Sequence, residues 1–403
     1  MNVLIVEPKL TSIAPNIALM KLARLCELNG YDFQYIRGCV KTNFIPDRIY
    51  MSFIFTYYSA IYEKTIDFYK RLYPNAEIII GGVFPTLFPN WFDKSKWKNP
   101  FFDIDRFYIH RGMYSDIETL IPKYNIDIIE EDKTSKDKQN RNSIVLYSSR
   151  GCTNKCKYCA VPTLEGKMKS YHSIKDNLEI GLKELPNAKS VVLYDNNFTA
   201  HEYFDNIVDE LIDFGLPVDI HGLHVSAFTE HQAEKLAKLK WGSQGLEKST
   251  AYIRFSFDKI EYRKHVDRAV SYVKKYNIGA EFFCYMLYNF TDSPHDFWMR
   301  LVYSQEISKK YGKYIFLFPQ RYEPFDAMKK YQYVGEKWTQ EYASGIRKMT
   351  TWLHGFLSIF PNGNLFRWIG FTEKEFFEKV YKFGTKKNYR LIKNSTDDVP
   401  EIM

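Results

Sequence analysis

The chain has 403 residues, a length typical of two or three domains, and 45% of them are hydrophobic, which is ample for buried cores. It contains no run of about 18 apolar residues, and its first residues lack the basic start of a signal peptide, so we expect neither a membrane span nor a secretory leader. The formal net charge of +8 permits an anionic partner, but the lysines are spread along the whole chain, so a nucleic-acid partner is not favoured.

The first third of the chain alternates short apolar strands with amphipathic helices, which predicts a parallel, doubly wound (Rossmann-like) α/β sheet. Ligands of such sheets bind beyond the carboxyl ends of the strands. Gly81, Gly82 and Thr86 lie at such an end, where glycine lets a ligand approach the backbone closely. His110, at the end of a fifth strand, is a further candidate for the same cleft. The other predicted strands cover residues 2–6, 31–37, 48–55 and 76–82, and the predicted helices cover 16–29 and 62–72.

A charged segment without apolar residues, 130–142, indicates a solvated linker between an N-terminal domain over 1–129 and a second alternation of strands and helices over 143–327. Six strand–helix units in this second region predict a partial (β/α)6 TIM-type barrel, in which chemistry is expected at the carboxyl ends of the strands. Its strands are predicted over 143–148, 190–194, 218–223, 252–257, 280–285 and 314–318, and its helices over 174–185, 203–214, 230–239, 262–276 and 296–310.

Three of the six cysteines, Cys152, Cys156 and Cys159, follow the first barrel strand at the spacing C-x3-C-x2-C. Thiolates select iron–sulfur clusters, and three of them on a four-iron cube leave one iron open to another ligand. A structural zinc site usually takes four ligands, commonly in C-x2-C pairs, and the next cysteine in the chain is Cys284. The loop therefore favours a 4Fe–4S cluster, with zinc as the alternative, and this cysteine usage predicts a reducing, cytoplasmic location.

The cysteine loop, with Tyr158 before its last cysteine, resembles that of the radical S-adenosylmethionine (radical SAM) superfamily, and six strand–helix units match the barrel of that family. The resemblance implies that SAM binds the open iron through its amino and carboxylate groups. An electron from the cluster then cleaves SAM to a 5′-deoxyadenosyl radical, which abstracts hydrogen from the substrate. It also implies a reductant partner such as flavodoxin or ferredoxin. No residue is assigned a catalytic role beyond these cofactors.

Polar residues at the ends of the barrel strands are the candidates for contact with SAM. By resemblance, Asp195, Asn196 and Asn197, after the second strand, would hold the SAM amino group, which suits carboxylate and amide acceptors. Arg254 and Ser256 share one face of the fourth strand, and Arg254 could pair with the SAM carboxylate. The backbone of Tyr158 would lie beside the adenine.

The N-terminal third resembles the cobalamin-binding domain that precedes the radical SAM core in one large subclass, and the Gly-Gly-x-x-Pro-Thr turn at 81–86 is the best match. This resemblance implies bound cobalamin and methylation of a substrate carbon. The Asp-x-His-x-x-Gly motif that supplies an axial histidine in many cobalamin proteins is absent from residues 7–12. Two alternatives therefore stay open: a cobalamin-independent rearrangement, oxidation or cyclisation with a vestigial N-terminal domain, and a zinc-containing nucleic-acid-binding protein.

The C-terminal region, 328–403, is expected to be helical and, by the same resemblance, to cover the mouth of the barrel. One long helix is predicted over 336–360, with breaks at Gly345 and Gly355, and a second helix over 373–383. The segment 320–324, after the last barrel strand, is expected to face the substrate. The tail from residue 385 is polar and is expected to be disordered.

Overall fold

The computed structural model describes residues 1–10, 15–92, 104–130, 142–243 and 250–385. They divide into two compact units, each described by itself below. Unit 1 comprises Met1–His221, Leu239–Ser249 and Phe325–Lys330, and unit 2 comprises Gly222–Lys238, Thr250–Pro324 and Tyr331–Met403. The predicted linker and the predicted disordered tail fall almost entirely on 131–141 and 386–403, outside the described residues.

Unit 1 begins with a parallel sheet of six strands in the order β5-β4-β3-β1-β2-β6. This order, with successive strands placed on both sides of β1, confirms the predicted doubly wound sheet. The short strand β6 was not predicted. The strands are β1 (Asn2–Glu7), β2 (Asp32–Arg37), β3 (Arg48–Ser52), β4 (Glu77–Gly81), β5 (Phe107–Ile109) and β6 (Ile128–Glu130).

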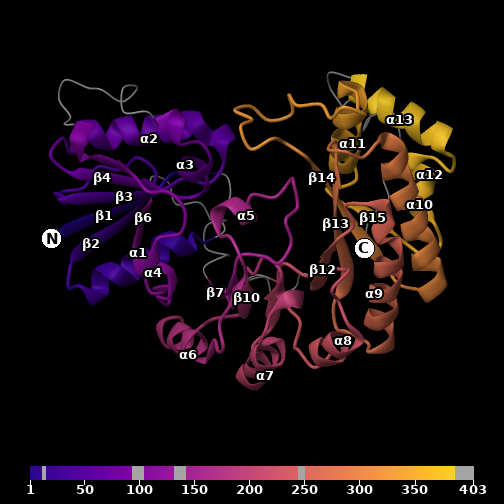
Figure 1. Cartoon of the computed structure of the whole chain (residues 1–403), viewed down its shortest axis with the longest axis horizontal. Coiled ribbons are helices and arrows are strands. Elements are labelled where there is room, and N and C mark those ends of the chain that lie inside the picture. The colour runs from indigo at the N-terminus through magenta and orange to yellow at the C-terminus, as the bar shows by residue number, and fades with distance from the viewer. Residues whose placement is uncertain (11–14, 93–103, 131–141, 244–249, 386–403) are drawn as a thin grey trace. The chain divides into compact units, whose positions relative to one another are not determined.

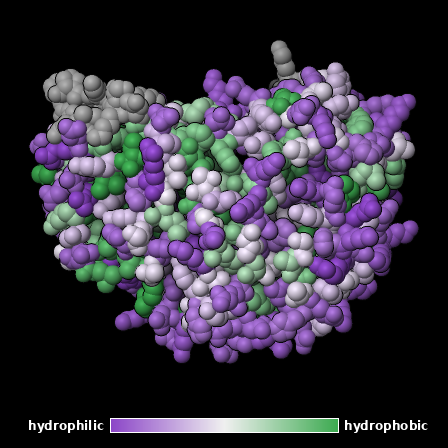
Figure 2. Space-filling model, in the orientation of Figure 1, coloured by the Kyte–Doolittle hydropathy of each residue, from purple (hydrophilic) through white to green (hydrophobic). Residues whose placement is uncertain are grey.

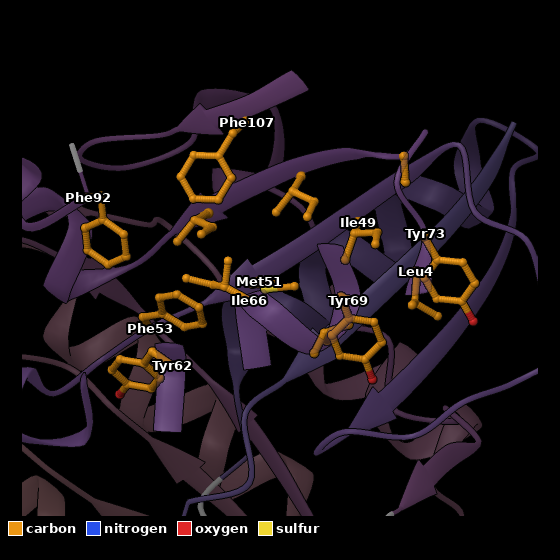
Figure 3. Close-up of a cluster of buried hydrophobic side chains, with 14 of the residues drawn as sticks. Leu4, Ile49, Met51, Phe53, Tyr62, Ile66, Tyr69, Tyr73, Phe92 and Phe107 are labelled. Atoms are coloured by element: carbon orange, nitrogen blue, oxygen red, sulfur yellow. The ribbon is translucent and has the colours of Figure 1, made fainter. Parts of the chain in front are cut away.

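The strand β1 shows why helices cover both faces of this sheet. Its residues are buried without interruption from Val3 to Val6, as expected for a parallel strand between two layers. Val3 and Ile5 belong to a core shared with α1 (Ile17–Leu28), whereas Leu4 and Val6 belong to a core shared with α2 (Ser59–Leu72). The two helices lie on opposite faces of the sheet in Figure 1, and Figure 3 shows the cluster of buried aromatic and aliphatic side chains that the sheet shares with α2.

Unit 1 also holds the first half of the predicted barrel as a three-stranded parallel sheet in the order β11-β10-β7. Its strands are β7 (Ser143–Leu146), β10 (Ser190–Leu193) and β11 (Val218–Ile220), and its helices are α6 (Lys175–Glu184) and α7 (Phe204–Phe214). The outer faces of these helices are hydrophilic in Figure 2. The side chain of Ile17, from α1, packs with Val145 and Val192, so the two sheets of unit 1 share apolar contacts.

Unit 2 holds the second half of the barrel as three parallel strands, joined at one edge by an antiparallel strand, in the order β12-β13-β14-β15. The expected α/β class with a partial barrel is therefore confirmed. The strands are β12 (Tyr252–Ser256), β13 (Glu281–Tyr288), β14 (Ile315–Arg321) and β15 (Leu357–Ile359), and the helices are α8 (Glu230–Leu236), α9 (Arg263–Lys275), α10 (Pro294–Tyr311), α11 (Gln340–Trp352), α12 (Asn364–Ile369) and α13 (Glu373–Thr385).

Over 336–360 the predicted break at Gly355 is confirmed, whereas the predicted break at Gly345 and the predicted helix beyond Gly355 are wrong. Helix α11 ends before His354 and Gly355, whose φ angles of 61° and 95° are left-handed and incompatible with a continuing helix. Leu357 and Ile359 then alternate as a strand and are buried against β14. Gly345 does not break the helix: a Cβ there would lie 2.0 Å from the Val380 carbonyl oxygen, so the glycine allows α11 and α13 to pack closely.

Across the described ranges, no helix is both long and apolar enough to cross a membrane.

Candidate functional site

The cysteine loop of unit 1 follows the two-residue strand β8 (Ser149–Arg150). Gly151 has φ of 74°, and a Cβ there would lie 2.4 Å from the Lys167 carbonyl oxygen, so only glycine fits at the start of the loop. The thiols of Cys152, Cys156 and Cys159 are free and half-buried. The loop is turned back on itself by a hydrogen bond from the Cys159 N–H to the Cys156 carbonyl oxygen, 3.0 Å.

The chemistry of the three thiols suits an iron–sulfur cluster, because thiolates are the ligands that such clusters bind. Burial raises the pKa of Cys159; the Val161 N–H opposes this, and the nearby thiols of Cys156 and Cys152 raise the pKa further. Thiolates gathered in this way repel one another unless a cationic group lies between them. No group of three His, Cys, Asp or Glu side chains in the described part of the chain is placed to hold one metal ion. A four-iron cluster instead binds each cysteine at a different iron.

The predicted SAM contacts of unit 1 all lie against this loop. The Asp195 side chain is buried, and its carboxylate accepts hydrogen bonds from the Ser148 N–H (3.1 Å), the Ser148 hydroxyl (3.0 Å) and the Ser149 hydroxyl. Asn197 donates to the Thr153 hydroxyl, 3.1 Å. Asp195 therefore fixes the strand end that leads into the loop, and Asn197 ties the loop to β10. Contact of Asp195, Asn196 and Asn197 with SAM stays a prediction.

The other predicted SAM residues are placed less specifically. Arg254 and Ser256 are half-buried and alternate along β12 with the buried Ile253 and Phe255, so they share one face of the strand as expected. Arg254 lies on unit 2, and the Arg254 guanidinium carbon is 5.9 Å from the centre of the Tyr252 ring. Tyr158 is half-buried in the cysteine loop. The roles of these three residues in binding SAM stay predictions.

A cavity of about 600 Å³ opens at the carboxyl ends of β3, β4 and β5 in unit 1, and its walls are mostly apolar. Gly81, Gly82 and Thr86, predicted to line a cleft, all line this cavity, and so does His110. Pockets for organic ligands are typically apolar with a few convergent polar groups. The buried Nε2 atom of His110 has no hydrogen-bond partner among the described residues, which makes it one such polar group.

Gly82 shapes the floor of the cavity. Its φ of 106° is accessible essentially only to glycine, and a Cβ there would lie 2.5 Å from the Phe53 carbonyl oxygen. The short helix α3 (Val83–Leu87) begins directly after it. The Thr86 hydroxyl donates to the Gly82 carbonyl oxygen (2.7 Å) and accepts from the Gly112 N–H (3.0 Å), so Thr86 fixes the turn that lines the cavity.

Charged residues that sequence reasoning did not identify connect the cavity to the cysteine loop. Arg150 lies 3.1 Å from a Glu118 oxygen and 3.2 Å from a Glu165 oxygen, and its guanidinium stacks on Tyr147 at 4.1 Å. All four of these side chains line the cavity. The second oxygen of Glu165 accepts from the Gly151 N–H, 2.7 Å, and from the Asn196 amide, 2.8 Å. The same carboxylate thus contacts both the cavity's arginine and the first turn of the cysteine loop.

Lys21 is a further buried cation in the cavity wall. It extends from α1, is 8% exposed, and donates to the Glu118 carbonyl oxygen at 2.5 Å. Burial lowers its pKa from 10.5 to about 8, and Glu118 and Arg150 act on it in opposite directions. The only sequence signal for this network was Arg150, directly before the Gly-Cys pair, because its partner carboxylates, Glu165 and Glu118, are 15 and 32 positions away.

Comparison with known proteins finds one family model that matches the central part of the chain. Residues 146–302 match the Radical SAM superfamily, and no curated protein matches the chain. A structure of the cobalamin-dependent S-adenosylmethionine radical enzyme OxsB with aqua-cobalamin bound has a TM-score of 0.52 at 13% identity, over 75% of this chain and 52% of OxsB. Streptococcus suis SuiB bound to S-adenosylmethionine has a TM-score of 0.36 at 16% identity, over 53% of this chain and 46% of SuiB. The chain thus spans about half the length of OxsB, and the likeness to OxsB is one of fold.

Proposed function

We propose that this chain, whose residues 146–302 form a radical SAM domain, is a cobalamin-dependent enzyme that methylates a carbon atom of its substrate. In this proposal Cys152, Cys156 and Cys159 hold the 4Fe–4S cluster that, with SAM, defines the family. The cavity at the ends of β3, β4 and β5 holds part of the cobalamin. A cavity of about 600 Å³ would enclose only part of so large a ligand.

The observation that carries the proposal is the shared wall of the cavity and the cysteine loop. Arg150 and Glu165 line the cavity, and Glu165 also accepts the Gly151 N–H at 2.7 Å. A ligand in the cavity would therefore lie next to the loop that holds the cluster. The fold that this chain shares with OxsB, whose structure contains aqua-cobalamin, supports the same assignment.

When bound, the cluster supplies the electron that cleaves SAM, and a methylated cobalamin supplies the methyl group. The chain's own residues hold and shield these groups. Glu165 fixes the entry to the cysteine loop through Gly151, and Asp195 fixes the strand end before it through Ser148 and Ser149. The apolar cavity wall excludes water from the bound ligand. A reductant such as flavodoxin or ferredoxin would deliver the electron.

The test uses protein purified without oxygen, reconstituted with iron and sulfide, and supplied with hydroxocobalamin. After desalting, we expect about four irons per chain and stoichiometric cobalt. The variant Cys156→Ala should lose most of the iron. Cys284→Ala, which removes a buried thiol of β13 outside the loop, is the matched control and should retain it. Retained iron and retained SAM cleavage in Cys156→Ala would contradict the cluster assignment.

A second candidate is a cobalamin-independent radical reaction, such as a rearrangement, oxidation or cyclisation. It is favoured by the sequence of residues 7–12, which lacks the axial-histidine motif of many cobalamin proteins. The same measurement separates the two: about four irons without cobalt would leave radical SAM chemistry in place and reject the cobalamin-dependent methylation.

A further inference from the structure

Two arginines of unit 2 meet at the carboxyl end of the last parallel barrel strand. Arg321 is the final residue of β14, and its side chain is only 3% exposed. Arg347 extends from α11. Both guanidinium groups face the same aromatic ring: the Tyr331 ring centre is 4.4 Å from the Arg347 guanidinium carbon and 5.9 Å from that of Arg321. Two like charges, one on a buried and one on a half-buried side chain, are thus brought to one ring.

The protein satisfies these arginines only in part. Arg321 donates through Nη2 to the Tyr333 carbonyl oxygen (2.6 Å) and to the Gln340 side chain (3.0 Å). Its Nε lies 3.6 Å from a Glu323 oxygen, an ion-pair distance. The buried Nε and Nη1 atoms of Arg321, and the buried Nε of Arg347, have no hydrogen-bond partner among the described residues. Buried donors in native proteins are almost always paired, so a group outside the chain is expected here.

Tyr331 is held over the pair by an unusual backbone. Its φ of 69° is left-handed, a conformation that residues other than glycine seldom adopt. The Tyr331 N–H donates to Glu323 (3.0 Å), and its carbonyl oxygen accepts from Gln340 (3.0 Å). Tyr331 as a residue is 39% exposed, so the Arg347 guanidinium stacks on a surface residue.

We propose that Arg321 and Arg347 form a binding site for an oxyanionic group, carboxylate or phosphate, of the substrate. Guanidinium groups bind such oxyanions through paired N–H donors. With Glu323, the cluster carries a net charge of +1, which favours an anion. The carboxyl end of β14 is the end of the strand at which barrel enzymes bind their substrates. The inference deepens the proposed function, on which it rests, by naming the charge of the substrate.

The test is a titration of the iron-reconstituted protein with inorganic phosphate at constant ionic strength, with chloride as the balancing salt and Tm as the readout. Phosphate should raise Tm in a saturable way. Arg347→Met should weaken the apparent phosphate affinity by about tenfold or more, as expected when a charged hydrogen-bond donor is lost. Its Tm without phosphate should fall only slightly, because the lost stacking on the Tyr331 ring is offset in part by the removal of one of two neighbouring positive charges.

Lys310→Met is the matched control, because it removes one positive charge from an exposed ion pair of the same unit; its phosphate response should equal that of the wild type. Arg321→Lys, which keeps the charge but not the guanidinium, should weaken the response as Arg347→Met does. A second titration with acetate separates the two ligand classes: a response to phosphate alone assigns a phosphate ester, and a response to acetate as well assigns a carboxylate.

Three results would overturn the proposal: no phosphate or acetate response in the wild type, an undiminished response in Arg347→Met, or loss of the response when the protein is first saturated with SAM. The last result would assign the arginines to the SAM carboxylate. None of these depends on cobalt, so failure here is distinguishable from failure of the proposed function.

Discussion

The ion pairs of Arg150 offer the sharpest test of how the cavity supports the cysteine loop. We predict that Arg150→Met destabilises unit 1. The side chains of Arg150, Glu118 and Glu165 are 15%, 21% and 12% exposed, so the pairs are largely buried. Removing one partner of a fully buried pair costs about 3–5 kcal/mol, whereas an exposed pair contributes about 0–1 kcal/mol.

The expected loss of stability lies just below the range for a fully buried pair, because both carboxylates keep other donors. Glu118 retains the Tyr171 hydroxyl at 3.0 Å, and Glu165 retains the Gly151 N–H at 2.7 Å. We therefore expect a loss of about 2–3 kcal/mol. At about 2–4 °C per kcal/mol for a unit of this size, the first thermal transition should fall by roughly 5–10 °C. Iron content after reconstitution should fall as well, because Glu165 would be left without its arginine beside the loop.

Differential scanning calorimetry measures this change directly. Lys175→Met is the control: Lys175 is 70% exposed and lies 3.8 Å from Glu179, so its loss should change the unfolding free energy by less than about 0.5 kcal/mol. Adding Glu118→Gln to Arg150→Met should reduce stability by less than the sum of the single changes, because the unpaired carboxylate is removed. A transition within about 1 °C of the wild type in Arg150→Met would refute the reasoning.

Three further outcomes are expected. In urea unfolding, Gly82→Ala should lower the unfolding free energy by about 3 kcal/mol, because the φ of 106° and the contact with Phe53 exclude a Cβ. In the control Gly81→Ala, the nearest atom to the new Cβ would be 3.9 Å away, so its unfolding free energy should stay within about 1 kcal/mol of the wild type. Equal losses in the two variants would contradict this. Lys21→Met should be more stable than the wild type at pH 7 by roughly 1–3 kcal/mol. The folded protein releases the Lys21 proton near pH 8 and the unfolded chain only near pH 10.5, so this difference in stability should shrink as the pH rises from 8 to 10.5. A stability difference that does not change with pH would contradict the lowered pKa of Lys21. Arg300→Met should cost unit 2 about 3–5 kcal/mol in calorimetry, because Arg300 is fully buried and pairs with Asp292 at 2.7 Å; Lys310→Met, at an exposed pair, should change little.

The helices and strands of both halves followed from local patterns. The apolar run of β1 and the amphipathic repeat of α1 each report burial within a few residues along the chain, so the sequence predicts their type and order. The exceptions include the short strand β6 and the segment after α11. There a three-residue strand, β15, was too short to produce a periodic signal, and its burial depends on the edge of β14, which lies some 40 residues earlier in the chain.

The candidate site likewise has a part that the sequence predicts and a part that it does not predict. The spacing of Cys152, Cys156 and Cys159 and the glycines at 81–82 could be recognised from the sequence because their chemistry is local: one loop holds the thiols, and one turn needs left-handed backbone. The buried position of Asp195 could not be recognised, because its partners Ser149, in β8, and Ser148, directly before β8, are 46 and 47 residues away. An acidic residue after a strand looks the same in the sequence whether it faces a ligand or fixes a neighbouring strand.

By itself, the sequence determined the fold class, the order of the strands and helices and the cysteine loop with its chemistry, because hydrophobic periodicity and ligand spacing act over short stretches of chain. Only the tertiary structure decided that Arg150 joins Glu118 and Glu165 at the wall of one cavity, and that Arg321 and Arg347 meet at one tyrosine ring. Contacts between distant charged residues leave no periodic pattern, because each is set by the way whole strands and helices pack.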